Sequence, residues 1–294
     1  MFKSMNVKEK AYQAVITAII LLVSVSSLLP LLYVLSTSLV GESEYIRKNG
    51  FVFFPDHPTI EPYLQLFEKM NFVNALGVSV AKTAAGTAIL LILTTIAAYA
   101  LSRKDIPGRK FMVIAVLVTI LFNAGLIPNF LVVNVLNLKN TLWALILPVA
   151  IDSWNVLVMK QFFENIPREM EESALIDGAG EIQMMVYIMI PMCVPVLAAI
   201  GLFAAVAHWN AWFDAMIYIS DFRLQPLQLF IRNMFVSGNI AAQMGVTVIN
   251  PAQKVSNETM KMALVVAGTL PILCIYPFLQ KYFVKGMFLG AVKG

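Results

Sequence analysis

The chain has 294 residues, of which 59% are hydrophobic and 13% are charged, with a mean hydropathy of +0.78 and a formal net charge of +4. Soluble domains carry about 25% charged residues, so this composition excludes an ordinary soluble protein and indicates that lipid surrounds most of the chain. The excess of basic residues does not indicate a nucleic-acid partner, because no soluble basic domain is present to bind one.

Six apolar stretches are each long enough to cross a bilayer, whose hydrocarbon core of roughly 30 Å needs about 20 residues of helix. Backbone polar groups in lipid must pair within their own segment, so we expect an all-α, polytopic membrane protein that forms one transmembrane domain over residues 1–294. The stretches cover residues 14–36, 76–101, 111–133, 142–162, 192–212 and 262–284. The first is too long for a signal-peptide core and lacks a clear cleavage site, so we expect it to be retained as a span.

Lysine and arginine positions predict the orientation, since these residues gather in short cytoplasmic segments. They occur near both ends of the chain and in the segment SRKDIPGRK, residues 102–110, after the second stretch. We therefore expect a multi-pass protein of the cell membrane with both termini in the cytoplasm. Residues 41–72 and 213–261 then lie outside, and the polar segment 163–191 lies inside.

The two outer segments are expected to be ordered. The first contains Pro55, Pro58 and Pro62, which favour fixed turns over a flexible linker. The second contains DFRLQPLQLFIRNMF, residues 221–235, whose apolar and basic positions have helical spacing and predict a short helix.

The inner segment NIPREMEESALIDGAGEIQMMVYIMIP, residues 165–191, predicts two short helices joined by a tight turn. Pro167 fits the first helical turn, where its missing N–H is not needed, and the glutamates after it suit the positive end of the helix dipole. Gly178 fits a left-handed stop, after which a second helix can run from about Gly180 to Ile190, before Pro191 at the start of the next span. From these residues alone, an elbow that enters a cleft on another protein and a solvated amphipathic loop are both compatible.

The spacing of Glu172-Ser173-Ala174, Gly178 and Ile188-Met189-Ile190-Pro191 resembles the "EAA" motif, E-A-A-x₃-G-x₉-I-x-L-P, of membrane subunits in ABC importers. Ser173 and Ile190 depart mildly from that pattern. Similarity extends to NALGVSVAKTAAGTAILLILTTIAAYALSRKDIPGRK and GMFLGAVKG, which resemble carbohydrate-importer permeases related to the smaller membrane subunit of the maltose system. AGLIPNFLVVNVLNLKNTLWALILP, FFENIP and AIGLFAAVAHWNAWFDAMIYI resemble the alginate and aldouronate branch of that family.

The resemblance implies ATP-driven import of an oligosaccharide, and the resemblance to the alginate and aldouronate branch implies that this cargo is acidic. In the family the elbow docks on a dimer of ATP-binding subunits, which hold ATP and Mg. A second homologous permease chain completes a heterodimeric pore, and an extracytoplasmic solute-binding protein delivers the cargo. The residues implied in ATPase coupling are Glu171, Glu172, Ser173, Ala174, Asp177, Gly178, Ala179, Ile188, Pro191, Gly290, Val292, Lys293 and Gly294. The last four form a tail that resembles the family's contact with the ATPase dimer, and a frayed end is the alternative.

Polar residues within spans tend to face a cavity or the bundle interior, so they are candidates for the substrate path. The candidates are Lys82, Asp152, Asn155, His208, Trp209, Asn210 and Trp212, a mixture in which rings can stack on sugars and amides can bond hydroxyls. Asp214 lies with the last four of these at the outer end of the fifth stretch. Other interpretations remain open. Lys82 is first expected to snorkel to the outer surface, and contact with a cargo carboxylate is the alternative. Trp143 and Trp212 are expected to anchor at the membrane interface, and His208 fits helix packing equally well.

Few residues are available for catalysis by the chain itself. It has two histidines, His57 and His208, and no G-x-S-x-G, H-E-x-x-H or G-x-x-x-x-G-K-[ST] pattern, so neither an intramembrane enzyme nor an ATPase is expected. Cys193 and Cys274 lie in apolar stretches, where free cysteine is commonly a small buried hydrophobe, so no disulfide or metal site is expected. The alternative function is an ion-coupled secondary transporter of small solutes. Transport that depends on ATP, and co-purification with an ATPase, would separate the two.

Overall fold

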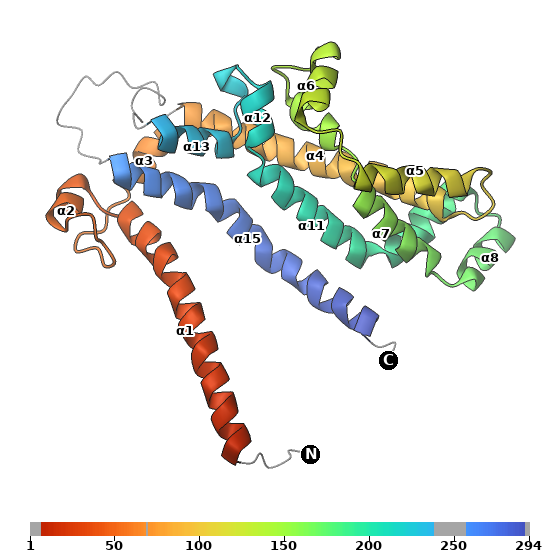
Figure 1. The fold of residues 1–294 in the computed structure, drawn as a ribbon, viewed down its shortest axis with the longest axis horizontal. Coiled ribbons are helices and arrows are strands. Elements are labelled where there is room, and N and C mark those ends of the chain that lie inside the picture. The colour runs from red at the N-terminus through yellow and green to blue at the C-terminus, as the bar shows by residue number, and fades with distance from the viewer. Residues whose placement is uncertain (1–6, 69, 238–256, 292–294) are drawn as a thin grey trace. The chain divides into compact units, whose positions relative to one another are not determined.

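Figure 1 shows the computed structural model, which describes residues 7–68, 70–237 and 257–291. The regular elements in these ranges are all helical, which confirms the predicted fold class. The chain divides into two compact units, one formed by residues 1–70 with 234–269 and the other by residues 71–233 with 270–294.

The first unit begins with the long apolar helix α1 (Val7–Ser38), followed by the short helices α2 (Glu42–Arg47) and α3 (Glu61–Glu68). The turn between α2 and α3 is tied back to the end of α1. The Tyr33 hydroxyl donates to the Gly50 carbonyl at 2.9 Å, and the Ser36 hydroxyl donates to the Phe53 carbonyl at 2.7 Å. These bonds give the segment a fixed course, as its prolines predict.

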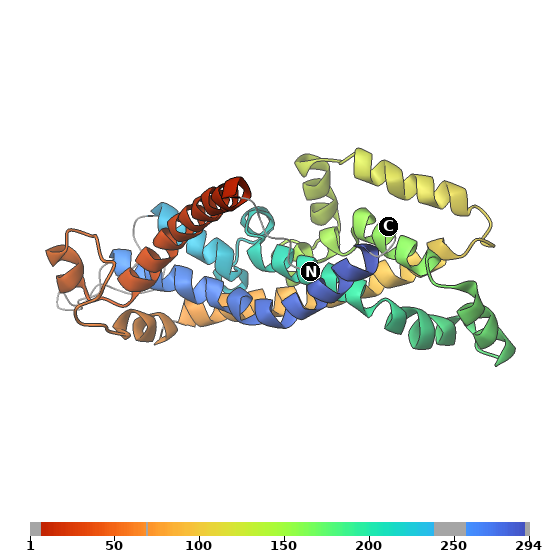
Figure 2. The ribbon, with the colours of Figure 1, turned by 90° about the horizontal axis from the view of Figure 1, so that it is seen from below.

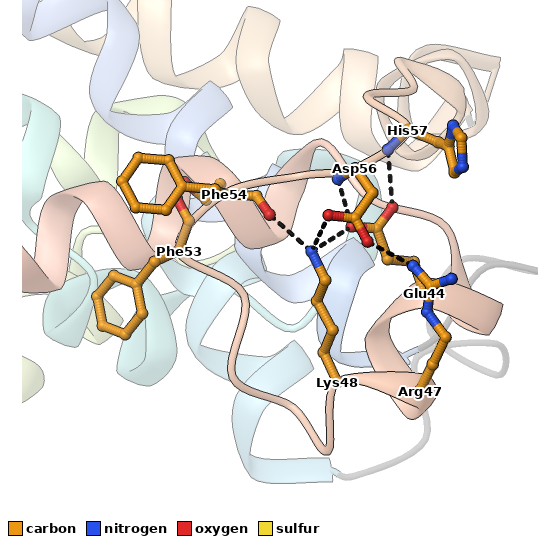
Figure 3. A network of polar contacts seen from close by, with 8 residues as sticks. Glu44, Arg47, Lys48, Phe53, Phe54, Asp56 and His57 are labelled. Carbon is orange, nitrogen blue, oxygen red and sulfur yellow. Dashed lines mark hydrogen bonds and ion pairs between the residues drawn. The ribbon is translucent and has the colours of Figure 1, made fainter.

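A charged network holds the same turn together (Figure 3). The Glu44 carboxylate is buried, accepts hydrogen bonds from the N–H groups of Asp56 and His57 at 2.7 and 3.1 Å, and pairs with Lys48 at 3.0 Å. Lys48 Nζ also donates to the Phe54 carbonyl and to Asp56, each at 2.7 Å. Burial by itself would raise the pKa of Glu44, but these hydrogen bonds and the lysine charge prevail and lower it to about 2.

The second unit contains most of the remaining elements, starting with the 33-residue helix α4. In chain order from there, the elements are α4 (Met70–Ser102), α5 (Arg109–Leu121), α6 (Leu126–Val135), η1 (Leu142–Leu145), η2 (Leu147–Val149), α7 (Ser153–Glu164), α8 (Arg168–Ile176), α9 (Glu181–Met184), the π-helical turn η3 (Met185–Met189), α10 (Ile190–Met192), α11 (Val194–Asn210), α12 (Phe213–Tyr218), η4 (Phe222–Leu224), α13 (Leu227–Ser237) and α15 (Asn257–Ala291). Helix α13 confirms the short helix expected after residue 221. Helices α13 and α15 each run across the boundary between the two units.

Three helices are long and apolar enough to cross a membrane within the described residues, namely α1, α4 and α15. Three further pairs pass the same test only when their two bent halves are taken together, so the described part of the chain holds three such helices or up to six spans. The bends are 114° between α5 and α6, 51° between the η1–η2 segment and α7, and 80° between the α9–α10 segment and α11. The stretches predicted as straight spans at 111–133 and 142–162 are therefore each broken.

The breaks follow from local chemistry. Between α5 and α6, α5 ends with an extended residue, Phe122, and the Asn123 side chain accepts a hydrogen bond from the Gly125 N–H at 2.8 Å. Gly125, the N-cap residue of α6, has a φ of +85°, a backbone conformation that favours glycine. Before α7, Pro148 lies in η2, and the Asp152 side chain accepts from the Asn155 N–H at 2.8 Å, which caps a new helix.

Helices α4 and α11 pack closely within the second unit (Figure 1). A β-carbon placed on Gly86 of α4 would lie 2.5 Å from Cε1 of His208, so the histidine ring occupies the space of the missing side chain. Further along, a β-carbon on Gly201 would lie 3.2 Å from Cδ1 of Leu91. The two glycines thus set how near these helices can approach.

Candidate functional site

The elbow predicted between residues 165 and 191 is present. Pro167 is the N-cap residue that precedes α8, one position earlier than the first-turn placement expected from sequence. Glu169 and Glu171 lie in the first turn, where the helix dipole favours negative charge. The helix then ends as predicted at Gly178, whose φ is +80°.

The end of α8 is closed by two backbone hydrogen bonds. The Gly178 N–H donates to the Leu175 carbonyl at 3.1 Å, and the Ala179 N–H donates to the Ala174 carbonyl at 2.9 Å. This is the Schellman pattern, which needs a left-handed residue at the position of Gly178. The turn into α9 is therefore tight and fixed by the backbone.

One face of the elbow packs inward and the other is exposed. Ala174, Met184 and Met189 are buried in a core cluster with residues of α4 and α7. Glu172, Ser173 and Asp177 are exposed, and so are the large apolar side chains of Ile176 (86%) and Ile182 (75%). Exposed isoleucines among carboxylates form a surface suited to a protein partner.

The inner side of the elbow is anchored by ion pairs to the end of α4. Arg103, the residue directly after α4, pairs with Glu171 of α8 and, at 3.3 Å, with Glu181 of α9. The Tyr99 hydroxyl contacts the same Glu181 carboxylate at 2.5 Å. Both views place the elbow helices at this end of α4 (Figures 1 and 2). A cavity of about 210 Å³ lies among the end of α4, the end of α7 and α8, with Phe163, Glu171 and Glu172 among its lining residues.

A second cavity, of about 410 Å³, lies among α4, α7, α11 and the start of α12. Asp152, Asn155 and His208 line it, so the structure brings these three predicted path residues together. Asp214 and Ala211 also belong to the lining. Asp152 serves as the N-cap of α7 as well, which gives this carboxylate a structural role in addition to its position in the cavity.

Lys82 does not snorkel to the surface as first expected. Its side chain is 1% exposed, and Nζ donates a hydrogen bond to the Ala211 carbonyl at 2.8 Å. Ala211 is the residue at which α11 ends, so the lysine places a cation on the negative end of that helix. Lys82 does not line the 410 Å³ cavity, although Ala211, whose carbonyl it binds, is one of the lining residues.

The remaining predicted path residues lie in other surroundings. Trp209 is buried and lines a small apolar cleft of about 60 Å³ with Thr83 and Ile272. Asn210 is exposed at the end of α11. Trp212 is 37% exposed, with the Arg232 guanidinium 4.7 Å from its ring centroid. The structure thus does not bring these three together with the polar cavity.

The other residues predicted to take part in ATPase coupling lie after the elbow and in the tail. Ile188 and Pro191 lie in η3 and α10, on the path from the elbow to α11. In the predicted tail, Gly290 belongs to the last turn of α15, and Val292, Lys293 and Gly294 lie outside the described residues.

Sequence reasoning missed Arg103 and Tyr99 at the elbow. Arg103 was visible only as one of several basic residues that set the orientation. Its spacing of four residues from Tyr99, at the end of an apolar stretch, places both on one helix face and was a usable signal. Asp214, which the sequence places with His208 at the outer end of the fifth apolar stretch, lines the same cavity as that histidine.

An all-helical membrane chain with a polar cavity among its helices and an exposed elbow at one end of α4 has the form of a transporter subunit. The chain belongs to the family described as binding-protein-dependent transport system inner membrane component, which matches residues 91–289. It is a multi-pass membrane protein of the ABC permease class.

The sequences of its relatives align with nearly the whole chain. Protein LplC of Bacillus subtilis (strain 168) is 41% identical over 91% of this chain and 90% of its own length. The polygalacturonan/rhamnogalacturonan transport system permease protein YtcP of the same organism is 36% identical, over 98% of this chain and all of its own. Among solved structures, a bacterial ABC transporter involved in the import of the acidic polysaccharide alginate matches with a TM-score of 0.87 at 27% identity, covering 96% of this chain and 100% of that one.

Proposed function

We propose that this chain is the membrane-spanning permease subunit of an ATP-driven importer of oligosaccharides. A second permease chain would complete the pore, a dimer of ATP-binding subunits carrying ATP and Mg would drive it, and a solute-binding protein would deliver the cargo. The family's dependence on a binding protein supports the last of these partners. Both termini would face the cytoplasm, where the elbow and the tail at 290–294 would meet the ATPase.

The observation that carries this proposal is the elbow. Its inner face is fixed by buried methionines and ion pairs, while Glu172 and Ile176 remain exposed on α8, which ends in the turn at Gly178. The Ile176 side chain is 86% exposed, so most of its apolar surface is available to a protein partner. A groove on the ATPase subunit would bury it.

Substituting the elbow tests the proposal. Glu172→Lys reverses the charge of the exposed motif glutamate, and Gly178→Asp places a β-carbon at a φ of +80°. Either change is expected to abolish uptake and to release the ATPase subunits during purification, while the permease remains in the membrane. Glu61→Lys, which reverses an exposed acid in the first turn of α3, is the matched control and should leave uptake unchanged. Normal uptake by both elbow variants would refute the proposal.

The cargo we propose is an acidic oligosaccharide, such as a uronic-acid oligomer. The polygalacturonan/rhamnogalacturonan permease and the alginate importer support this, since both are named for acidic polysaccharides. The 410 Å³ cavity would form part of the path, with the Asp152 and Asp214 carboxylates and the Asn155 amide available to sugar hydroxyls. An ion-coupled secondary transporter is not favoured, because the chain belongs to a family of binding-protein-dependent permeases.

A further inference from the structure

We propose that Arg103 is a positioning residue that fixes both helices of the elbow to α4, so that a displacement of the elbow is passed to this long helix. The inference rests on the proposed docking role of the elbow and adds the route by which docking reaches the spans. Arg103 itself touches neither cargo nor nucleotide in this scheme.

The contacts of Arg103 reach three elements at once. One terminal nitrogen pairs with Glu171 of α8, and the other contacts Glu181 of α9 at 3.3 Å, the Tyr99 hydroxyl and, at 2.8 Å, the sulfur of Met184. The guanidinium carbon also lies 4.5 Å from the centroid of the Tyr99 ring. Because a guanidinium is planar and its donors are fixed in a fork, these contacts hold the two elbow helices at a set angle to α4.

Tyr99 also connects α4 to α9. Its hydroxyl lies 2.5 Å from Oε2 of Glu181 and 3.1 Å from the Glu181 carbonyl. The first turn of α9 is therefore held by its side chain and by its backbone, both from α4. Tyr99 and Met184 also belong to one buried core cluster, so the polar contacts border a packed apolar contact.

The two adjacent glutamates of α8 point to different partners. Successive side chains of a helix leave it about 100° apart, so the two carboxylates take different directions even though both residues line the 210 Å³ cavity. The Glu171 side chain is 24% exposed and faces Arg103, whereas Glu172 is exposed. One carboxylate thus ties α8 to its own chain, and the next is free to meet another protein. When a partner displaces α8 through Glu172, the ion pair between Glu171 and Arg103 transmits the displacement to α4.

Removing the guanidinium tests the proposal in the complete reconstituted transporter. Arg103→Gln should raise the number of ATP molecules hydrolysed per oligosaccharide imported by at least about fivefold, the lower end of typical coupling between sites. The ATPase subunits should still co-purify, since the exposed face is unchanged. Arg103→Lys, which keeps the charge and loses the fork, should give an intermediate ratio. Lys110→Gln removes an exposed charge nearby and is the matched control with an unchanged ratio.

A second set of variants guards against loss of folding. Glu181→Gln acts on a side chain that is 68% exposed, so it removes one partner with little effect on stability, and it should also raise the ratio. The double variant Arg103→Gln/Glu181→Gln should be no worse than Arg103→Gln alone, because both act on one connection. Well-folded Arg103→Lys and Glu181→Gln variants with a wild-type ratio would overturn the proposal. If Glu172→Lys uncouples transport and these variants do not, only the role of Arg103 fails. If Glu172→Lys has no effect, the docking role of the elbow fails first.

Discussion

Gly86 shows how a single missing side chain can set the distance between two helices. The His208 ring fills the space that a β-carbon on Gly86 would occupy, with ring atoms 2.5–2.9 Å from that position. Gly77 lies on the same helix, yet a β-carbon there would meet nothing within 4 Å. The two glycines therefore differ in environment although both are helical.

We predict that Gly86→Ala destabilises the protein and that Gly77→Ala does not. Overpacking of this kind costs about 1–3 kcal/mol, whereas an unhindered Gly→Ala change in a helix favours the fold by about 0.5–1 kcal/mol. Thermal unfolding in detergent would show a lower midpoint for Gly86→Ala alone. Combining it with His208→Ala should restore part of the loss, because the new methyl group then has room. A Gly86→Ala protein as stable as the wild type would contradict the close contact.

The partners of single residues were the least predictable part of the site. Lys82 was expected to reach the surface because snorkelling is the common fate of lysine near a span end. It instead binds the Ala211 carbonyl, 129 residues away in the sequence. No local pattern reports such a pairing, because it depends on which helices pack together. Asp152 was recognised as an unusual polar residue, but its capping role became apparent only with the start of α7.

At the scale of elements, predictions succeeded where local chemistry decides the structure. The end of α8 at Gly178 follows from a backbone conformation that glycine adopts readily, and it could be predicted from the residue and its spacing. The bends were missed because hydropathy averages over about 20 residues and does not register a two- or three-residue break. Gly125 and Pro148 marked two of the breaks, but both lie within otherwise apolar stretches.

The segment between α2 and α3 gives a pH prediction for one element. The pKa of Glu44 is lowered to about 2 in the fold from an ordinary value of 4.5. A lowered folded-state pKa means that the ionised group stabilises the fold fully above pH 4.5, and that this contribution is lost as the pH falls from 4.5 towards 2. We expect pepsin to cut residues 48–60 faster in Glu44→Gln than in the wild type at pH 4.5, with the difference shrinking as the pH approaches 2.

The comparison has an internal control on the same helix. Glu42→Gln removes an acid from the first turn of α2 that does not join the network around Lys48, so its cleavage should follow the wild type. A Glu44→Gln protein whose cleavage matches the wild type throughout this pH range would show that the network does not hold the segment.

At the scale of the whole molecule, the charge of the cavity bears on the cargo. Its two carboxylates, Asp152 and Asp214, suit hydroxyl donors and repel an anionic sugar. The nearby cation, Lys82, is hydrogen-bonded to Ala211 and does not line the cavity. If the cargo is acidic, Asp152 and Asp214 would bind its hydroxyl groups, and cations on another surface of the pore would bind its carboxylates.

We therefore predict that Asp152→Asn shifts selectivity towards acidic cargo. Asparagine caps a helix as well as aspartate does, so α7 should remain intact while one negative charge leaves the cavity. A unit charge acting over several ångströms in a partly hydrated site contributes on the order of 1 kcal/mol, which corresponds to about a two- to tenfold change. The measurement is the ratio of uptake rates for an acidic oligosaccharide and for its carboxyl-reduced, neutral counterpart of the same length.

Asp56→Asn, on the turn between α2 and α3, is the control and should leave the ratio unchanged. An unchanged ratio in Asp152→Asn would mean that the cargo does not pass this cavity, whatever its charge.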